Sequence, residues 1–244
     1  MTHSIINAVS SSLKDYAINT RRHFHEYPEL SNKEYETTKY IINELETMGI
    51  PYVTPGRTGV IAIINGDKPG KVLGIRADID ALPIDEKNDV KYKSKNQGVM
   101  HACGHDAHAA ALLTTAKILS KMKNSFSGKI KLIFQPAEEY FPSGALTMMS
   151  KGDLDDVDAF IGAHVLNSLE IGTVSAEEGP RMAASASLNI KVIGRGGHGG
   201  MPHDAIDAIV TAAAILMNLQ SIVSRGLDIS NSAVISIGTI TAGT

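Results

Sequence analysis

Four short runs rich in Val and Ile, separated by segments with helical spacing, most constrain the fold of this chain. The runs are GVIAIING (59–66), KVLGIRAD (71–78), KIKLIFQ (129–135) and DAFIGAHV (158–165). Apolar runs of this length are typical of strands buried on both faces, and helices between them allow parallel pairing. The pattern therefore predicts an α/β fold with a mainly parallel sheet flanked by helices.

Three helices are predicted around these strands. Residues 4–24 have helical spacing, and a second helix is bounded by Ser31 and Glu34 as a capping-box pair and by Gly49 at its end. A third helix of about 17 residues begins at Asp106, where leucines and alanines recur at helical spacing.

The character of the sequence changes after the fourth run. An alternating segment (185–197), a long helix (204–223) and a second alternating segment (232–240) predict a strand, a helix and a strand. We therefore predict two domains. Residues 1–180 form the N-terminal part of the larger α/β domain, and residues 181–244 form part of a second, smaller α+β domain.

The composition excludes several classes of partner. A formal net charge of −3, without a block of Lys and Arg, argues against nucleic acid and an anionic membrane. The single cysteine cannot form an intrachain disulfide. The N-terminus lacks signal-peptide character, and no run of about 18 apolar residues predicts a membrane-spanning helix. We expect a soluble cytoplasmic protein.

Candidate metal ligands lie at the ends of successive predicted strands and at one helix start. They are Asp78, Asp80, Cys103, His105, Glu138, Glu139 and His164. The carboxyl ends of parallel strands meet at one edge of a sheet, where ligands commonly bind. A thiolate, two imidazoles and a carboxylate suit a borderline divalent cation. The sequence therefore predicts a metal site in which Glu139 binds metal and Glu138 accepts a proton from water.

Each of these residues also has a simpler structural interpretation. A lone buried cysteine such as Cys103 is usually an inert apolar residue, and a Glu–Glu pair is usually solvated. Asp78 and Asp80 are of the residue type that caps turns. His101 and His108 are interpreted as residues that support the ligands or as surface residues. The coincidence of Cys-x-His, Glu-Glu and His at successive strand ends favours the metal site.

A glycine-rich loop surrounds His198 in the segment GRGGHGGMPHDA (194–205). Its glycines permit close backbone approach and motion. It is not a phosphate-binding loop, because no Gly-Lys-Ser/Thr follows. The loop is either a functional element around His198 or a flexible connection with an exposed histidine.

Six motifs, in this order, resemble those of the amidohydrolase branch of the aminoacylase metallopeptidases, the twentieth metallopeptidase family. They are RRHFHEYPELSNKEYET (21–37), GIRADIDALPI (74–84), HACGHDAH (101–108), FQPAEE (134–139), GAHV (162–165) and GRGGHGGMPH (194–203). That branch includes N-acyl-L-amino acid amidohydrolases, hippurate hydrolases, N-acetyldiaminopimelate deacetylases and auxin-conjugate hydrolases. The resemblance implies metal-dependent hydrolysis of the amide bond of N-acyl amino acids. It also implies a zinc-peptidase-like catalytic domain with a smaller lid and dimerisation domain.

The resemblance assigns roles to individual residues of the site. It implies that Cys103, His105, Glu139 and His164 bind two divalent metal ions, with Mn, Zn, Co and Ni as candidates. It makes Glu138 the general base that acts on metal-activated water.

Two further residues and the oligomeric state also follow from the resemblance. Asp80 matches the acidic residue that orients the site. His198 matches a small-domain histidine that helps polarise the substrate carbonyl, often in the active site of the partner subunit. The resemblance implies a homodimer through the small domain. Family members continue beyond this length and supply one more histidine ligand, so we expect the sequence to be truncated at its C-terminus.

Two other functions are compatible with the same residues. The first is a metallo-dipeptidase on the same scaffold. The second is a metal-binding fragment without activity, whose small domain serves only for association. Metal content without turnover would favour the fragment.

Overall fold

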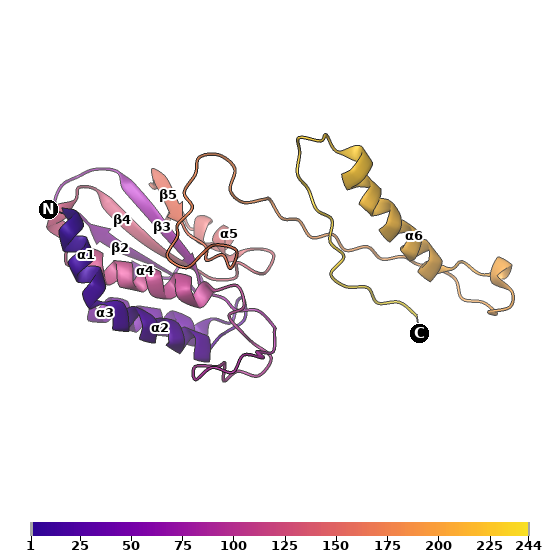
Figure 1. The fold of residues 1–244 in the computed structure, drawn as a ribbon, viewed down its shortest axis with the longest axis horizontal. Coiled ribbons are helices and arrows are strands. Elements are labelled where there is room, and N and C mark those ends of the chain that lie inside the picture. Colours follow the sequence, from indigo (N-terminus) through magenta and orange to yellow (C-terminus); the bar gives the residue numbers. More distant parts are fainter. Residues whose placement is uncertain (1, 244) are drawn as a thin grey trace. The chain divides into compact units, whose positions relative to one another are not determined.

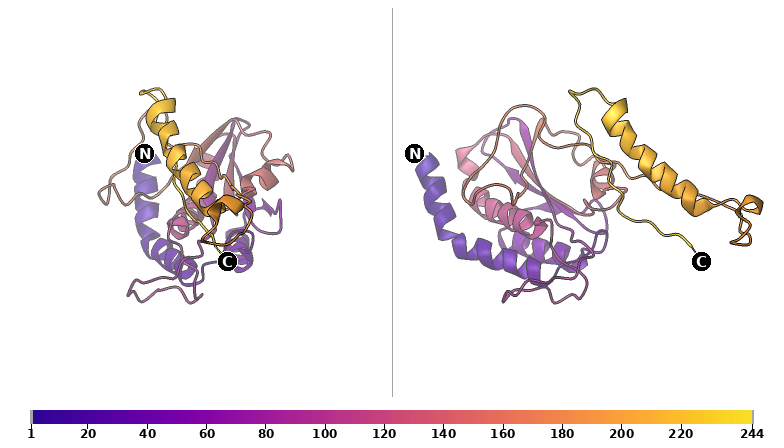
Figure 2. Two further views of the ribbon diagram at one scale, coloured as in Figure 1. Left: turned by 90° about the vertical axis from the view of Figure 1, so that its right-hand side faces the viewer. Right: turned by 45° about the vertical axis from the view of Figure 1, so that its right-hand side comes forward.

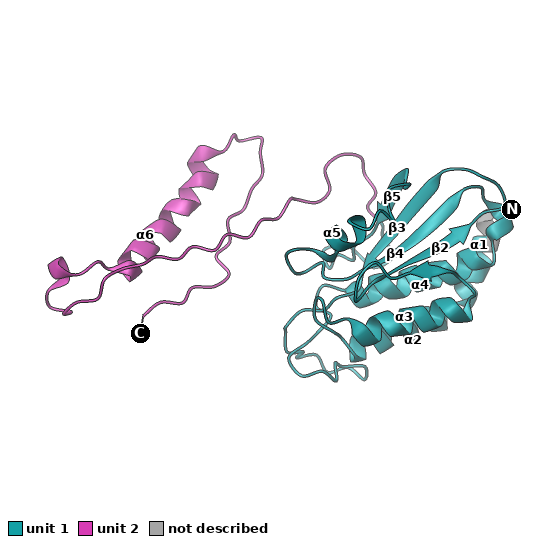
Figure 3. Cartoon of the chain, turned by 180° about the vertical axis from the view of Figure 1, so that it is seen from behind, with its two compact units in different colours: residues 1–174 teal, residues 175–244 magenta. Residues whose placement is uncertain are grey.

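A computed structural model describes residues 2–243 of the chain. The chain separates into two compact units, residues 1–174 and residues 175–244 (Figure 3). All strands among the described residues belong to the first unit. The predicted domain boundary, after residue 180, lies slightly C-terminal to the boundary between the two units, after residue 174. The assignment of the two domains stays a prediction.

The first unit is built on a five-stranded sheet with the strand order β1-β2-β4-β3-β5 (Figure 1). The four apolar runs form β2 to β5, which confirms the prediction of an α/β fold. The strands are β1 (Tyr52–Val53), β2 (Val60–Asn65), β3 (Val72–Asp78), β4 (Lys129–Gln135) and β5 (Ala159–Gly162).

The sheet is mixed rather than mainly parallel, which corrects that part of the prediction. β3 pairs in parallel with β4 and with β5, whereas β2 pairs antiparallel with β1 and with β4. The connection between β2 and β3, residues 66–71, can reverse the chain. It is too short for a parallel crossover, which needs about a dozen residues or more. β2 therefore runs opposite to β3, and β4 lies between them.

Helices cover both faces of this sheet. On one face α3 packs on β2, and α4 packs on β3 and β4, with α1 and α2 against α4. On the other face α5 contacts β4, and Figures 1 and 2 show these layers from three sides. The helices are α1 (Thr2–Ser12), α2 (Lys14–Glu26), α3 (Tyr35–Thr47), α4 (His105–Ser120) and α5 (Gly144–Met149).

The alternation of side chains along β4 separates two apolar clusters. Leu132 and Phe134 join the main cluster with α3 and α4. Ile133, between them, joins Ile61 and Met148 on the side of α5. Successive side chains of a strand point to opposite faces, so a strand covered on both faces is mostly apolar. This explains the predominantly apolar runs in the sequence, in which Arg76 of β3 and Lys131 of β4 are exceptions.

The predicted helix boundaries agree at one end of α3 and differ near the N-terminus. Residues 4–24 form two helices, α1 and α2, with a break at Leu13. Just before the break, Ser12 Oγ donates to the carbonyl of Val9 at 2.7 Å, a contact that competes with helical hydrogen bonds. The predicted stop at Gly49 is confirmed by its φ of 63°, which favours glycine.

The capping box predicted at Ser31 and Glu34 is wrong. α3 begins at the residue after Glu34, and no side chain of that N-cap residue bonds its first turn. Glu29 provides this function instead, because its Oε2 accepts from Thr37 N at 2.8 Å and its Oε1 from Glu36 N at 3.2 Å. The side chains of Ser31 and Glu34 point to other partners, described below.

The second unit contains one long helix, α6 (Ala208–Ser221), continued by a π-helical turn over Ile222–Gly226. The strands predicted at 185–197 and 232–240 are wrong, since no strand is formed among residues 175–243. A strand needs a neighbour that accepts and donates its backbone hydrogen bonds. Within the described part of the chain only one residue of these segments finds such a neighbour, Arg195, which forms an isolated antiparallel bridge with Ile206. The predicted α+β arrangement is therefore not observed there.

The helical stretch Ala208–Gly226 is long and apolar enough to cross a membrane, judged by length and composition alone. Asn218, Gln220 and Arg225 interrupt its apolar character. This finding differs from the expectation that no segment of the sequence has the character of a membrane-spanning helix. Some core helices of globular proteins also meet these criteria of length and composition. The absence of a membrane partner and the cytoplasmic location therefore stay predictions.

A buried polar network joins α2 to the start of α4. His25 Nδ1 lies 2.7 Å from Asp106 Oδ2, and His25 Nε2 lies 3.1 Å from Glu86 Oε1. Arg21 Nε also pairs with Asp106 Oδ2, at 2.7 Å. The hydrogen bond with Asp106 raises the pKa of His25, while burial opposes the shift and Glu86 adds to it. The network holds the first turn of α4 against α2.

We expect His25→Gln to remove a pH-dependent part of the stability of the chain. The pKa of His25 is raised above its ordinary 6.5 in the folded chain. Its stabilisation is therefore complete below pH 6.5 and is lost as the pH rises through the raised pKa. Urea unfolding should show the wild-type chain more stable than the variant by about 1.5–3 kcal/mol at about pH 5.5. The difference should shrink at about pH 9.

His23→Gln is the matched control for this measurement. Burial lowers the pKa of His23, so the unfolded chain binds its proton more tightly than the folded chain. The stability difference between wild type and this variant should grow with pH instead of shrinking. A His25→Gln difference that is constant between these pH values contradicts the role of the network.

Candidate functional site

Three adjacent parallel strands bring the candidate ligands to one edge of the sheet. β4, β3 and β5 run in the same direction, so their carboxyl ends lie together. Asp80 follows β3, Glu138 and Glu139 follow β4, and His164 follows β5. α4, which packs on β3 and β4, begins at this edge with His105. The tertiary structure thus gathers residues from four separate segments.

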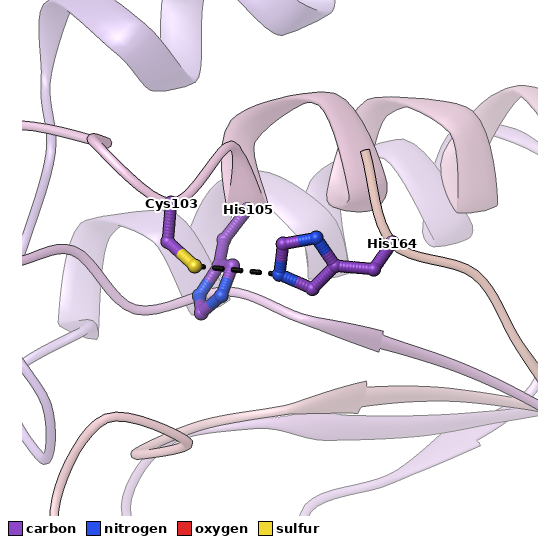
Figure 4. Close-up of side chains that lie close together, drawn as sticks. All are labelled: Cys103, His105 and His164. Atoms are coloured by element: carbon purple, nitrogen blue, oxygen red, sulfur yellow. Dashed lines mark hydrogen bonds between the residues drawn. The ribbon is translucent and has the colours of Figure 1, made fainter. Parts of the chain in front are cut away.

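Cys103, His105 and His164 point toward one another (Figure 4). Cys103 Sγ lies 3.3 Å from His164 Nε2, and the potential ligand atoms of the three residues lie within 4.8 Å of one another. His105 also forms a group of the same size with Glu138 and Glu139. Because His105 belongs to both groups, the five side chains form one continuous cluster. We call it the ligand cluster.

Asp80 fixes the orientation of His105. The Nδ1 atom of His105 lies 2.9 Å from the backbone oxygen of Asp80 and 3.2 Å from its Oδ1. A carbonyl oxygen can only accept, so Nδ1 carries the proton and Nε2 keeps a free lone pair. Nε2 lies 3.8 Å from Glu139 Oε1 and 3.7 Å from Asp78 Oδ2. An acidic residue behind an imidazole fixes its tautomer in this way at metal sites.

Gly104 allows Cys103 and His105 to join the same cluster. Its φ of 87° lies in the left-handed region that favours glycine. A Cβ at this position would lie 2.3 Å from Cγ2 of Val165, the residue after His164. Conformation and space therefore both require glycine in the Cys-Gly-His sequence.

His108 and Asp78 support the ligand cluster from behind. His108 Nδ1 lies 2.5 Å from Asp78 Oδ1, and His108 Nε2 accepts from the backbone N of Val165 at 3.0 Å. Both ring nitrogens are thereby occupied, although His108, Asp78 and His105 also lie close enough together to hold a metal. The surface alternative for His108 is wrong. Its position one helical turn after His105 is the sequence signal for this role.

His101 is also buried, with 4% of its surface exposed, so its surface alternative is wrong as well. Neither of its ring nitrogens has a hydrogen-bond partner among the described residues. Burial lowers its pKa to about 4, which keeps the ring neutral at neutral pH.

His198 belongs to the second unit, where it is exposed. Its Nδ1 accepts a hydrogen bond from Gly200 N at 3.0 Å. The ring proton of the neutral histidine is therefore on Nε2, which is free to donate. The catalytic role of His198 stays a prediction.

Negative groups accumulate around the ligand cluster. Burial raises the pKa of the Cys103 thiol to about 12, and Glu139, Asp78 and Glu138 contribute to this shift. Burial and the neighbouring Glu139 raise the pKa of Glu138. Burial alone would raise the pKa of Asp78, but the hydrogen bond with His108 and nearby cationic groups lower it to about 2. A thiol crowded by carboxylates is the chemistry that a divalent cation stabilises, so these residues fit such an ion.

Two side chains that support the site are not identified from the sequence. Ser31 Oγ donates to Asp80 Oδ2 at 2.7 Å, and Glu34 Oε1 accepts from Ala137 N at 2.8 Å. The Ser-x-x-Glu spacing is a signal for a helix start, which is why it predicts capping. Nothing local in the sequence distinguishes that role from contacts with residues far along the chain.

Comparison with known proteins identifies the family. Residues 74–233, more than half of the chain, match peptidase family M20/M25/M40. The chain belongs to this family of metallopeptidases, which confirms the family predicted from the motifs.

The chain is similar over all or nearly all of its length to named relatives. It is 46% identical to the N-acyl-L-amino acid amidohydrolase of Geobacillus stearothermophilus, covering 100% of this chain and 66% of that protein. It is 45% identical to the N-acetyl-L-cysteine deacetylase of Bacillus subtilis, covering 96% of this chain and 56% of that protein. The chain therefore spans less than two thirds of the length of these relatives.

A solved structure supports the fold. A Bacillus subtilis protein described as a dinuclear metal binding peptidase from the M20 family is 43% identical, with a TM-score of 0.66. The similarity covers 71% of this chain and 48% of that protein.

Proposed function

We propose that this chain forms the metal-binding part of a hydrolase that cleaves the amide bond of N-acyl amino acids. The observation that carries the proposal is the ligand cluster, in which Cys103, His105, Glu139 and His164 converge beside Glu138. The names of the relatives at about 45% identity support the substrate class.

The proposed metal ligands are Cys103, His105, Glu139 and His164, and the proposed cofactors are two divalent ions. A mixed set of thiolate, imidazole and carboxylate suits Zn, Mn, Co or Ni. The dinuclear description of the Bacillus subtilis relative supports the number of ions. When bound, such ions supply Lewis acidity, which polarises a carbonyl and lowers the pKa of water.

Glu138 is the proposed general base. Its pKa is raised by burial and by Glu139, which moves it toward the range in which a carboxylate exchanges protons at neutral pH. It takes a proton from the attacking water and passes it to the leaving amine. Asp80 holds His105 in the tautomer that a metal requires, and this supports its proposed orienting role.

His198 is proposed to donate a hydrogen bond to the substrate carbonyl. The hydrogen bond from Gly200 N to Nδ1 leaves a donating Nε2, which supports this role. A donor aimed at the carbonyl oxygen stabilises the negative charge that develops there during attack.

We also propose a homodimer with C2 symmetry, formed through the second unit. In the described structure α6 leaves several large apolar side chains exposed, among them Ile209 at 54%, Val210 at 65% and Met217 at 75%. Apolar area of this kind is stabilised when it is covered by another surface. Two-fold symmetry would make the contribution of each His198 to the other subunit reciprocal.

The metal assignment predicts the behaviour of ligand variants. After loading with Zn²⁺ or Mn²⁺ and dialysis against metal-free buffer, Cys103→Ala and His105→Ala should each retain less metal than the wild type. The exposed His203 is a matched control, and His203→Ala should retain the wild-type content. Elemental analysis showing unchanged metal in both ligand variants would make the assignment wrong.

Glu138→Gln should retain metal and lose turnover of N-acetyl amino acids. The substitution keeps the shape of the side chain and removes only the proton acceptor, which typically lowers kcat by about 100-fold to 10,000-fold. The assay uses this chain and a family-length version in parallel. Near-normal kcat in the variant would refute the general base. Metal content without turnover in this chain, with turnover in the family-length version, would favour a metal-binding fragment.

The proposed dimer predicts a mass of two subunits. Sedimentation equilibrium at micromolar concentration should report it for the family-length version, and the isolated chain should associate through the same unit. Met217→Lys, on the exposed surface of α6, should shift the equilibrium toward the monomer. A strictly monomeric mass for both lengths would exclude the dimer.

A further inference from the structure

We propose that Glu34 is a positioning residue for Glu138. It acts through the backbone turn that carries Glu138, residues 136–139, which follows β4. The inference rests on the proposed function, in which Glu138 is the general base. Glu34 Oε1 accepts a hydrogen bond from Ala137 N at 2.8 Å, across 103 positions of the chain. The contact therefore links the segment before α3 to the residue immediately before Glu138.

Glu138 lies between two anchored backbone amides. The amide of Ala137 is the first anchor. The amide of Glu139 is the second, because it donates to Asp80 Oδ2 at 2.9 Å. The same oxygen accepts from Ser31 Oγ at 2.7 Å. With an anchored amide on each side, the backbone of the proposed base has little freedom to shift.

The turn adopts a conformation that needs such support. Ala137 has a φ of 47°, in the left-handed region that disfavours residues with a side chain. Strained conformations persist where the surroundings determine them, often at active sites. A Cβ on Gly59 would lie 2.5 Å from Pro136 Cδ, and a Cβ on Gly144 would lie 2.1 Å from the oxygen of Pro136. The residue before the turn is thus tightly enclosed, while Glu34 holds the turn itself.

The surroundings of Glu34 are unusual for a residue at a helix start. Its surface is 0% exposed, and burial raises the pKa of its carboxyl while backbone N–H donors oppose the shift. α3 does not need this carboxyl, because Glu29 binds the amides of the first turn. A buried carboxyl is unfavourable without partners. Asn32 N and Ala137 N both donate to Oε1, whereas Oε2 has no hydrogen-bond partner among the described residues. Its function is therefore to hold the turn.

Three variants separate this role from a general effect on folding. Glu34→Met keeps the length of the side chain and removes the acceptor. Glu34→Gln keeps an acceptor oxygen. Glu29→Gln is the matched control, because it alters a carboxylate that binds amides of the same region but not Ala137.

Amide hydrogen exchange measured by NMR on this chain tests the anchor without reference to activity. Exchange at Ala137 should be at least about tenfold faster in Glu34→Met than in the wild type, because its hydrogen-bond acceptor is gone. In Glu34→Gln, exchange at Ala137 should be measurably faster than in the wild type but by no more than about threefold, because a neutral oxygen still accepts, more weakly than a carboxylate. Glu29→Gln should speed exchange at Thr37 and leave Ala137 unchanged.

Two results would overturn the anchor. One is equal protection of the Ala137 amide in Glu34→Met and the wild type. The other is exchange at Ala137 that is accelerated as much in Glu29→Gln as in Glu34→Met. If Glu34→Met does not fold, Glu34→Gln decides alone. Its neutral oxygen accepts more weakly than a carboxylate, so Ala137 must exchange measurably faster while the interior of α4 does not. No change at Ala137 refutes the proposal.

Turnover of N-acetyl amino acids by a family-length version tests the consequence for Glu138. Glu34→Met should lower kcat about 10-fold to 100-fold with KM nearly unchanged, Glu34→Gln should restore most of it, and Glu29→Gln should match the wild type. Equal loss in Glu34→Met and Glu29→Gln would reduce Glu34 to a structural residue. If the wild type itself shows no turnover, the proposed function fails while the exchange result still stands.

Discussion

The parallel pairing of β3 with both β4 and β5 is the constraint on which the rest of this structure depends. Because the three strands run in one direction, the segments that follow them meet at one edge of the sheet. Asp80, Glu139 and His164 reach the same place for this reason, although they lie far apart in the chain. The antiparallel β2 extends the sheet on the other side and contributes no ligand.

The hydrogen bonds of each side chain at this edge determine which of its atoms remain available to bind a ligand. His105 and His108 lie one helical turn apart on α4, yet their roles differ because their partners differ. Nδ1 of His105 is held by Asp80 and leaves Nε2 open, whereas both nitrogens of His108 are occupied by Asp78 and Val165. Burial, together with the neighbouring carboxylates, raises the pKa of Cys103 to about 12, and a divalent cation compensates the negative charge of such a cluster.

Local patterns in the sequence predict much of the first unit. The four apolar runs are the strands β2 to β5, because a strand buried on two faces needs mostly apolar residues. The predicted helix end at Gly49 is observed, because a left-handed φ favours glycine. The prediction of a mainly parallel sheet is wrong. Strand pairing depends on the strand order, and the sequence pattern does not show that β4 inserts between β2 and β3. The strands predicted at 185–197 and 232–240 are absent because alternation alone provides no hydrogen-bonding neighbour.

The sequence by itself determined the family, the α/β class and the residue types that gather at the strand ends. Those follow from motifs and from apolar patterns that each segment carries alone. Only the tertiary structure decided the partners of these residues. Ser31 and Glu34 have the spacing of a helix cap, but Ser31 bonds Asp80 and Glu34 bonds Ala137, 49 and 103 positions away. A hydrogen-bonding side chain has the same local sequence signal whichever acceptor or donor it meets, and packing of distant segments determines which one is within reach.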